Sequence, residues 1–109
     1  MKLIALISML VVTTSAFAQN AAFVSGNKLK TSCDSTETAS AGICLGYALG
    51  VADATNREYC APGGERGVTG GQILSVVKKY FSDNPSSLHQ DANVLILRSL
   101  KEAFPCSRK

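Results

Sequence analysis

Residues 44–53, CLGYALGVAD, form the centre of the longest helix that the sequence predicts. This helix covers residues 38–57 and is apolar on nearly all sides, which is typical of the buried centre of a bundle. It holds three glycines spaced four residues apart, Gly42, Gly46 and Gly50, which form one narrow stripe. Glycine inside a helix costs about 1 kcal/mol relative to alanine, so the stripe requires a compensating contact. We predict that another helix backbone approaches it closely, either within the chain or on a second subunit.

Asp53 is the one acidic residue of this predicted helix and lies on the side of the glycine stripe. A buried carboxylate is costly unless it accepts hydrogen bonds. We favour a structural role, in which Asp53 accepts hydrogen bonds from backbone N–H groups, for example at the start of the third helix. The alternative is a catalytic or ligand-binding role, but no histidine, second carboxylate or hydroxyl nucleophile is grouped with Asp53.

A short helix is predicted before the glycine-bearing helix, and a third helix after it. Ser25 or Asn27 caps the first helix, which ends near Cys33. Thr69 and Gln72 have the spacing of a capping box for the third helix, which runs to about residue 82. The predicted core face of the third helix consists of Ile73, Val76, Val77, Tyr80 and Phe81.

A last helix follows the polar loop 83–90, is capped by Asp91 and ends near Phe104. Arg98 and Glu102 are expected to pair on its outer side, because they are four residues apart. The predicted core face consists of Ile96, Leu97, Leu100, Ala103 and Phe104. No segment alternates as a strand does, so the predicted fold class is all-α, a small bundle of about four helices.

The start of the chain has the pattern of a secretory signal peptide, residues 1–18. Lys2 precedes an apolar run over residues 3–12, and a small-x-small site ends at Ala18. We predict that the mature protein begins at Gln19, is a single helical domain and lies in the periplasm. The apolar run is short for a bilayer span, and an uncleaved anchor is the alternative.

The four cysteines all follow the predicted signal peptide: Cys33, Cys44, Cys60 and Cys106. An even number in a short exported chain indicates two disulfides. A zinc site is the rival interpretation, but the chain has no C-x-x-C pair and His89 is its one histidine. Four cysteines allow three pairings, and their spacing does not choose among them.

Composition and motifs argue against several function classes. Without Lys2 the chain keeps ten Lys and Arg against eight Asp and Glu, a net charge of about +2, with no basic stripe that predicts nucleic-acid binding. The segment GGERG lacks the context and the Lys-Ser/Thr pair of a phosphate-binding loop. Oxidised cysteines leave no thiol nucleophile, and His89 stands alone in a polar loop. We therefore predict a protein that is not an enzyme and has no cofactor or metal.

Segments along most of the chain resemble the Tai/Rap immunity proteins. They are FVSGNKL, CLGYALGVAD, GVTGGQILSVVKKYFSDNP and LKEAFPC, within residues 23–106. The resemblance implies an all-helical, disulfide-bonded periplasmic domain that forms a homodimer and in which the glycine stripe is architectural. It also implies that the partner is a peptidoglycan amidase effector of the type VI secretion system, inhibited by occupation of its active-site groove. The first helix, NKLKTSC, departs from the family by being more basic.

Two loops are the predicted contacts with such an amidase. The loop 61–68 presents Glu65 and Arg66 at its tip, where they would pair with charged or hydrogen-bonding groups around a cysteine–histidine cleft. The alternative is that this loop is a solvated connector. The second candidate is the loop 83–90, with Ser87, His89 and Gln90.

The alternative function is that of a general periplasmic helper, such as an acid-stress chaperone. A chaperone of that kind exposes apolar surface on acidification through many carboxylates. The chain has eight acidic residues and they are not clustered, which favours the inhibitor.

The predicted disulfides pair Cys33 with Cys44 and Cys60 with Cys106. The first bridge would join the end of one helix to the early part of the next, and the second would tie the end of the central helix to the chain terminus. In the loop-entropy model they stabilise the fold by about 3 and about 4 kcal/mol.

Overall fold

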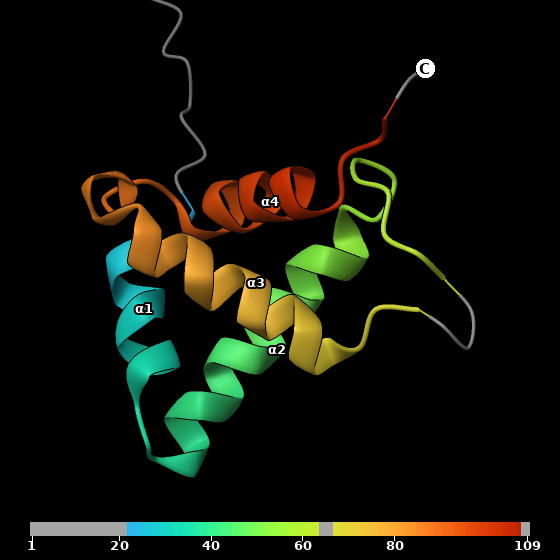
Figure 1. The fold of residues 1–109 in the computed structure, drawn as a ribbon. Helices are drawn as coiled ribbons and strands as arrows, with labels where there is room; N and C mark the ends of the chain where they lie inside the picture. The colour runs from blue at the N-terminus through green and yellow to red at the C-terminus, as the bar shows by residue number, and fades with distance from the viewer. Residues whose placement is uncertain (1–21, 64–66, 108–109) are drawn as a thin grey trace, which may run out of the picture.

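Four α-helices and one 3-10 helix make up the part of the chain that the computed structural model describes, residues 22–63 and 67–107 (Figure 1). No strand occurs in these ranges, and the predicted all-α class is confirmed. The signal peptide and its cleavage site lie outside the described residues. The elements are α1 (Gly26–Asp34), α2 (Thr38–Ala54), α3 (Gly70–Asp83), η2 (Pro85–Ser87) and α4 (Ala92–Ala103).

Helices α1 and α2 form the two arms of a V, and α3 crosses in front of it while α4 lies over its open end (Figure 1). The helices enclose one hydrophobic core, to which all four contribute side chains. None of the described helices is long and apolar enough to cross a membrane.

Side-chain caps fix where α1 and α3 begin. Ser25, rather than Asn27, caps α1: its hydroxyl accepts a hydrogen bond from the backbone N–H of Lys28 at 3.2 Å. The predicted capping box of α3 is confirmed. The Thr69 N–H donates to Gln72 Oε1 at 2.7 Å, and the Gln72 N–H donates to Thr69 Oγ1 at 3.2 Å. These bonds satisfy helix-terminal N–H groups that would otherwise lack partners.

The predicted core face of α3 is nearly correct, because Val76 alone among its five residues is half-buried rather than buried. The predicted face of α4 is rotated from the observed one. Leu97 and Phe104 are half-buried and Ala103 is exposed. The buried face of α4 consists of Ala92, Leu95, Ile96, Ser99 and Leu100. Ala92 and Ser99 belong to it although a search for large hydrophobic residues does not select them. Ser99 is tolerated there because its hydroxyl donates to the Ile96 carbonyl oxygen at 2.6 Å.

Of two polar predictions for α4, the cap is correct in position but lacks its side-chain bond, and the ion pair is wrong. Asp91 is the N-cap residue, but its carboxylate accepts from the backbone N–H of Ala22 at 3.5 Å and makes no capping bond to the helix. Arg98 donates to Gln90 Oε1 at 3.4 Å instead of pairing with Glu102. Asp91 turns toward Ala22, before α1, and Arg98 toward Gln90, just before α4, and helical spacing alone reveals neither contact.

The glycine stripe of α2 faces outward. A Cβ added at Gly42, Gly46 or Gly50 would meet nothing within 4 Å, so no described helix of the same chain covers them. Ile43 is 60% exposed and Leu45 37% exposed, and the prediction that α2 is the buried centre of the bundle is wrong for the single chain. Apolar residues on all sides of α2 concealed which side is covered. The buried side consists of Cys44, Ala48 and Ala52.

Both predicted disulfides are confirmed. Cys33 and Cys44 are 6% and 1% exposed and join the last turn of α1 to α2 inside the core. Cys60 and Cys106 are exposed, and their bond ties the segment after α2 to the segment after α4. The Cys60 N–H also donates to the Phe104 carbonyl oxygen at 2.9 Å, which fixes the same junction.

The glycine that permits a close contact is Gly26, the first residue of α1. A Cβ at this position would lie 2.5 Å from Leu95 Cδ1 and 2.8 Å from the Leu88 carbonyl oxygen. The Gly26 N–H donates to the Gln90 carbonyl oxygen at 2.8 Å, and the Asn27 N–H donates to that of Leu88 at 2.7 Å. The start of α1 therefore rests directly on the backbone that precedes α4.

We predict that Gly26→Ala destabilises the protein by about 1–3 kcal/mol, because the new methyl group collides with fixed backbone. Urea denaturation followed by circular dichroism measures the change. Gly63→Ala is the control, since its Cβ would meet nothing within 4 Å. Equal unfolding midpoints for the two variants would show that the contact at Gly26 is not tight.

Candidate partner-binding surface

Asp53 lies exposed near the end of α2. No hydrogen bond to its carboxylate is found among residues 22–63 and 67–107, and the start of α3 is capped by Thr69 and Gln72 instead. The predicted role of Asp53 in accepting backbone N–H bonds there is therefore wrong. Being exposed, the carboxylate requires no such compensation. Asp53 lines a small hollow of about 270 Å³ together with Tyr59. Burial, and then the charge of Asp53, raise the pKa of the Tyr59 hydroxyl.

Within the described ranges, no three His, Cys, Asp or Glu residues gather closely enough to hold a metal ion. All four cysteines are disulfide-bonded. His89 is exposed, and its Nδ1 lies 3.1 Å from the Ser86 carbonyl oxygen. The remaining candidates for function are exposed loops and the hollows between helices.

The segment between α3 and α4, residues 84–90, is held by many bonds. Asn84 donates from both its backbone N–H, at 3.0 Å, and its side-chain amide, at 2.8 Å, to the Tyr80 carbonyl oxygen. Leu88 is 4% exposed and anchors the segment in the core. Of the three predicted contact residues, the structure leaves His89 exposed, while Ser87 and Gln90 are half-buried. The segment is a preformed surface feature rather than a loose connector.

The loop after α2 has a closed base. The Val68 N–H donates to the Pro62 carbonyl oxygen at 3.2 Å, and the Cys60–Cys106 disulfide fixes the start of the loop. The ring of Tyr59 lies against that of Phe104, with centroids 6.3 Å apart. Glu65 and Arg66, predicted at the tip of this loop, lie outside the described residues.

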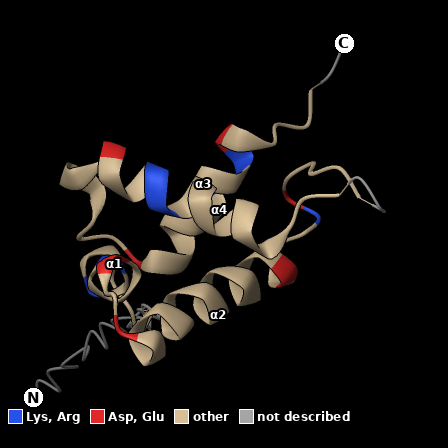
Figure 2. Cartoon of the chain, turned by 60° about the horizontal axis from the view of Figure 1, so that its bottom comes forward, with Lys and Arg blue, Asp and Glu red and all other residues tan. Residues whose placement is uncertain are grey.

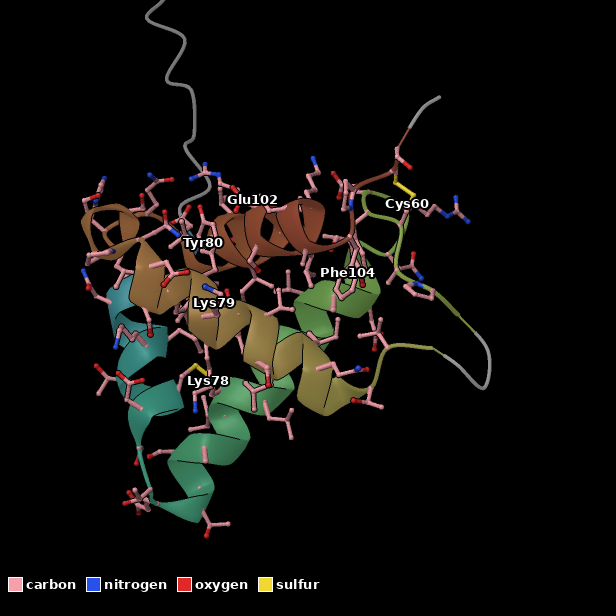
Figure 3. All side chains as sticks on the ribbon, in the orientation of Figure 1. Cys60, Lys78, Lys79, Tyr80, Glu102 and Phe104 are labelled. Carbon is pink, nitrogen blue, oxygen red and sulfur yellow. A yellow bond between two sulfur atoms is a disulfide. The ribbon has the colours of Figure 1, made fainter. Side chains whose placement is uncertain are left out.

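A groove that sequence reasoning missed runs along α3: its narrower part lies between α3 and α4, and its wider part lies between α3, Val68 and Phe104, the residue after α4. It consists of two adjoining hollows of about 300 and about 510 Å³, which share Val76 in their lining. Figure 3 shows Lys79, Tyr80 and Glu102 along one part and Phe104 at the other end. The remaining lining residues are Val68, Thr69, Gly71, Gln72, Ser75, Asp83, Asn84, Ser99 and Ala103. We call this feature the α3–α4 groove. The half-burial of Val76 and Phe104, both predicted as core residues, is what leaves it open.

Charges in the α3–α4 groove are unequal. Lys79 forms an ion pair with Asp83 at 2.6 Å, and the hydrogen bond to this carboxylate, followed by its charge, raises the pKa of Lys79. Glu102 forms no ion pair with any described residue, since Arg98 is turned toward Gln90. The groove therefore combines apolar side chains, mainly in its wider hollow, with one exposed carboxylate, that of Glu102, which has no ion pair among the described residues. By contrast, Figure 2 shows α2 free of charged residues along most of its length, in accord with its sequence from Thr38 to Ala52.

Residues 25–106 match the sequence pattern of the Rap1a immunity proteins. The match contains all four helices and both disulfides, and the chain belongs to the Rap1a immunity protein family. Membership indicates an immunity protein that binds a cognate effector. No curated protein matches the chain.

We predict opposite outcomes for two neighbouring substitutions in residues 84–90. Leu88→Ala removes a buried anchor and should destabilise the protein by about 2–4 kcal/mol. His89→Ala should change stability by less than about 0.5 kcal/mol, because the side chain is exposed. Chemical denaturation measures both values. A large loss for His89→Ala would mean that its contact with Ser86 supports the fold.

Proposed function

We propose that this protein is the immunity protein of a type VI secretion amidase effector and that it inhibits the amidase by blocking its active-site groove. Membership of the Rap1a immunity protein family supports the proposal. The single observation that carries the blocking mode is the anchored segment 84–90, which adjoins the α3–α4 groove at Asn84. The protein supplies no chemistry of its own in this mode.

We infer that the protein works in the periplasm, as one domain from Gln19 onward. The signal-peptide pattern of residues 1–18 supports export. The two disulfides support an oxidising compartment, because such bonds are rare in the cytosol. Peptidoglycan, the substrate of an amidase effector, is reached in the same compartment.

Rigid loops suit inhibition because a binder loses affinity when a mobile segment must be ordered on association. In residues 84–90 the backbone bonds and Leu88 have already fixed the conformation, so His89 is presented at little entropic cost. Ser87 and Gln90 border it on the same segment. Glu65 and Arg66 remain the second proposed contact, at the loop whose base is closed by Cys60 and Val68.

We further propose that the outward face of α2 binds a second copy of this chain. Three glycines on a solvent-exposed helix face weaken the helix by about 1 kcal/mol each, with no gain in the single chain. Against the α2 of another copy they would allow the two backbones to approach closely, and Ile43 and Leu45 would be covered. The absence of charge from Thr38 to Ala52 suits such a self-complementary contact.

Purified amidases with a cysteine–histidine active site test the proposed function. We expect one of them to bind the mature protein and to lose its peptidoglycan-cleaving activity in the complex. A triple variant, Ser87→Ala/His89→Ala/Gln90→Ala, and the pair Glu65→Ala/Arg66→Ala should each weaken binding by about ten-fold or more. If wild-type protein binds none of these amidases, the amidase target is wrong. If both variants bind like wild type, the contact lies elsewhere.

The dimer is tested by the mass in solution of wild type and Gly46→Leu. We expect a dimer for wild type and a folded monomer for Gly46→Leu, because the new side chain meets open space in the single chain but blocks a close helix contact. Ser82→Leu is the control, since it adds the same group at an exposed site on α3. A monomeric wild type, or a dimer that survives Gly46→Leu, contradicts the proposal.

A further inference from the structure

We propose that the α3–α4 groove seats a segment of the amidase in which an aliphatic or aromatic side chain neighbours a lysine or arginine. This inference rests on the proposed function and adds the surface and the chemistry of the contact. The groove is independent of the loop residues assigned above, because neither Ser87, His89 nor Gln90 lines it.

The lining of the wider hollow favours an apolar side chain of the partner. That hollow, about 510 Å³, is bordered by Val68, Val76 and Phe104, all three half-buried and partly open to solvent. Covering them removes apolar surface from water, which is the main favourable term in association. The polar rim at Gln72 and Ser75 leaves this part bounded rather than continuous with a larger apolar surface.

The unpaired carboxylate of Glu102 favours a cation of the partner at the narrower hollow. Lys79 is already paired with Asp83, whereas the carboxylate of Glu102 has no described ionic partner. An arginine or lysine of the partner would meet Glu102 while its aliphatic stem lies over Ala103 and Val76. An acidic partner segment would instead place a like charge beside Glu102.

The groove extends between the described ends of the two proposed contact loops. Thr69, which ends the loop after α2, lines the wider hollow, and Asn84, which begins the segment 84–90, lines the narrower one. In Figure 1, α3 runs between these two ends, so a segment lying along the groove would extend from Thr69 to Asn84. A partner that touched the loops alone would leave the apolar side chains of the wider hollow uncovered.

Two substitutions alter the groove without touching the core. Glu102→Lys reverses the unpaired charge, and Ser75→Tyr fills the wider hollow. Each has a matched control. Glu58→Lys makes the same charge change at an exposed site outside the groove. Thr31→Tyr replaces another exposed helical hydroxyl that donates to the carbonyl oxygen four residues earlier, as Ser75 does.

Affinity for the amidase that wild-type protein captures, measured by calorimetry, tests the inference. We expect Glu102→Lys and Ser75→Tyr each to weaken binding by about ten-fold or more, and the two controls to bind like wild type. Glu102→Gln should also weaken binding and reduce its dependence on salt concentration, because the lost contact is ionic. A merely structural effect would not change the salt dependence.

The outcomes separate this inference from the proposed function. If wild type binds an amidase and all groove variants bind equally well, the groove is not part of the interface and the function stands. If Ser75→Tyr weakens binding while Glu102→Lys and Glu102→Gln do not, the groove is occupied but its partner is not cationic, which overturns the proposed chemistry. If wild type binds no amidase, both the function and this occupant are wrong.

Discussion

The close backbone contact between the start of α1 and the segment before α4 is the constraint on which the rest of the structure depends. It joins residues far apart in the chain: the Gly26 N–H bonds to Gln90, and the Ala92 N–H bonds to the Val24 carbonyl oxygen at 2.9 Å. These bonds satisfy N–H groups at the beginning of both helices, where no partner exists within the helix. A side chain larger than that of glycine at position 26 would separate the two segments. The same contact holds the backbone of Leu88 and Gln90 against α1, and so helps to fix Leu88 in the core and the conformation of residues 84–90.

The disulfides extend the same constraint to the other parts of the fold. The Cys33–Cys44 disulfide links α1 to α2, and the Cys60–Cys106 disulfide links the start of the loop after α2 to the segment after α4. A bundle of this size has a small core and gains much of its stability from such cross-links. For a binding protein the gain is also functional, because a surface that is rigid before association loses less conformational entropy in the complex.

Local signals in the sequence predicted the helices well, since caps and apolar spacing act within a few residues. The Thr69–Gln72 capping box agrees with the structure, as does the buried face of α3 except at Val76. Properties that depend on how helices lie against each other were not predictable in the same way. The observed face of α4 includes Ser99, which can be buried because its hydroxyl donates to a carbonyl oxygen of its own helix. The groove exists because Val76 and Phe104 are only half-buried, at the edge of the core. For α2, apolar on all sides, no pattern distinguished the covered face from the open one.

The contrast between the glycines shows how one small domain would bind both of the partners proposed above. Gly26 is packed against backbone of its own chain, whereas Gly42, Gly46 and Gly50 have open space above them. Because α2 turns Cys44, Ala48 and Ala52 toward the core, its glycine face points away from the helices that form the α3–α4 groove. A second copy on α2 would therefore leave the groove and the segment 84–90 accessible. The two surfaces also differ in chemistry, one uncharged over fifteen residues of helix and the other apolar with a single unpaired carboxylate. This difference opposes exchange of partners between them, since a cationic segment gains nothing on the face of α2 and an uncharged helix leaves Glu102 without a counter-charge.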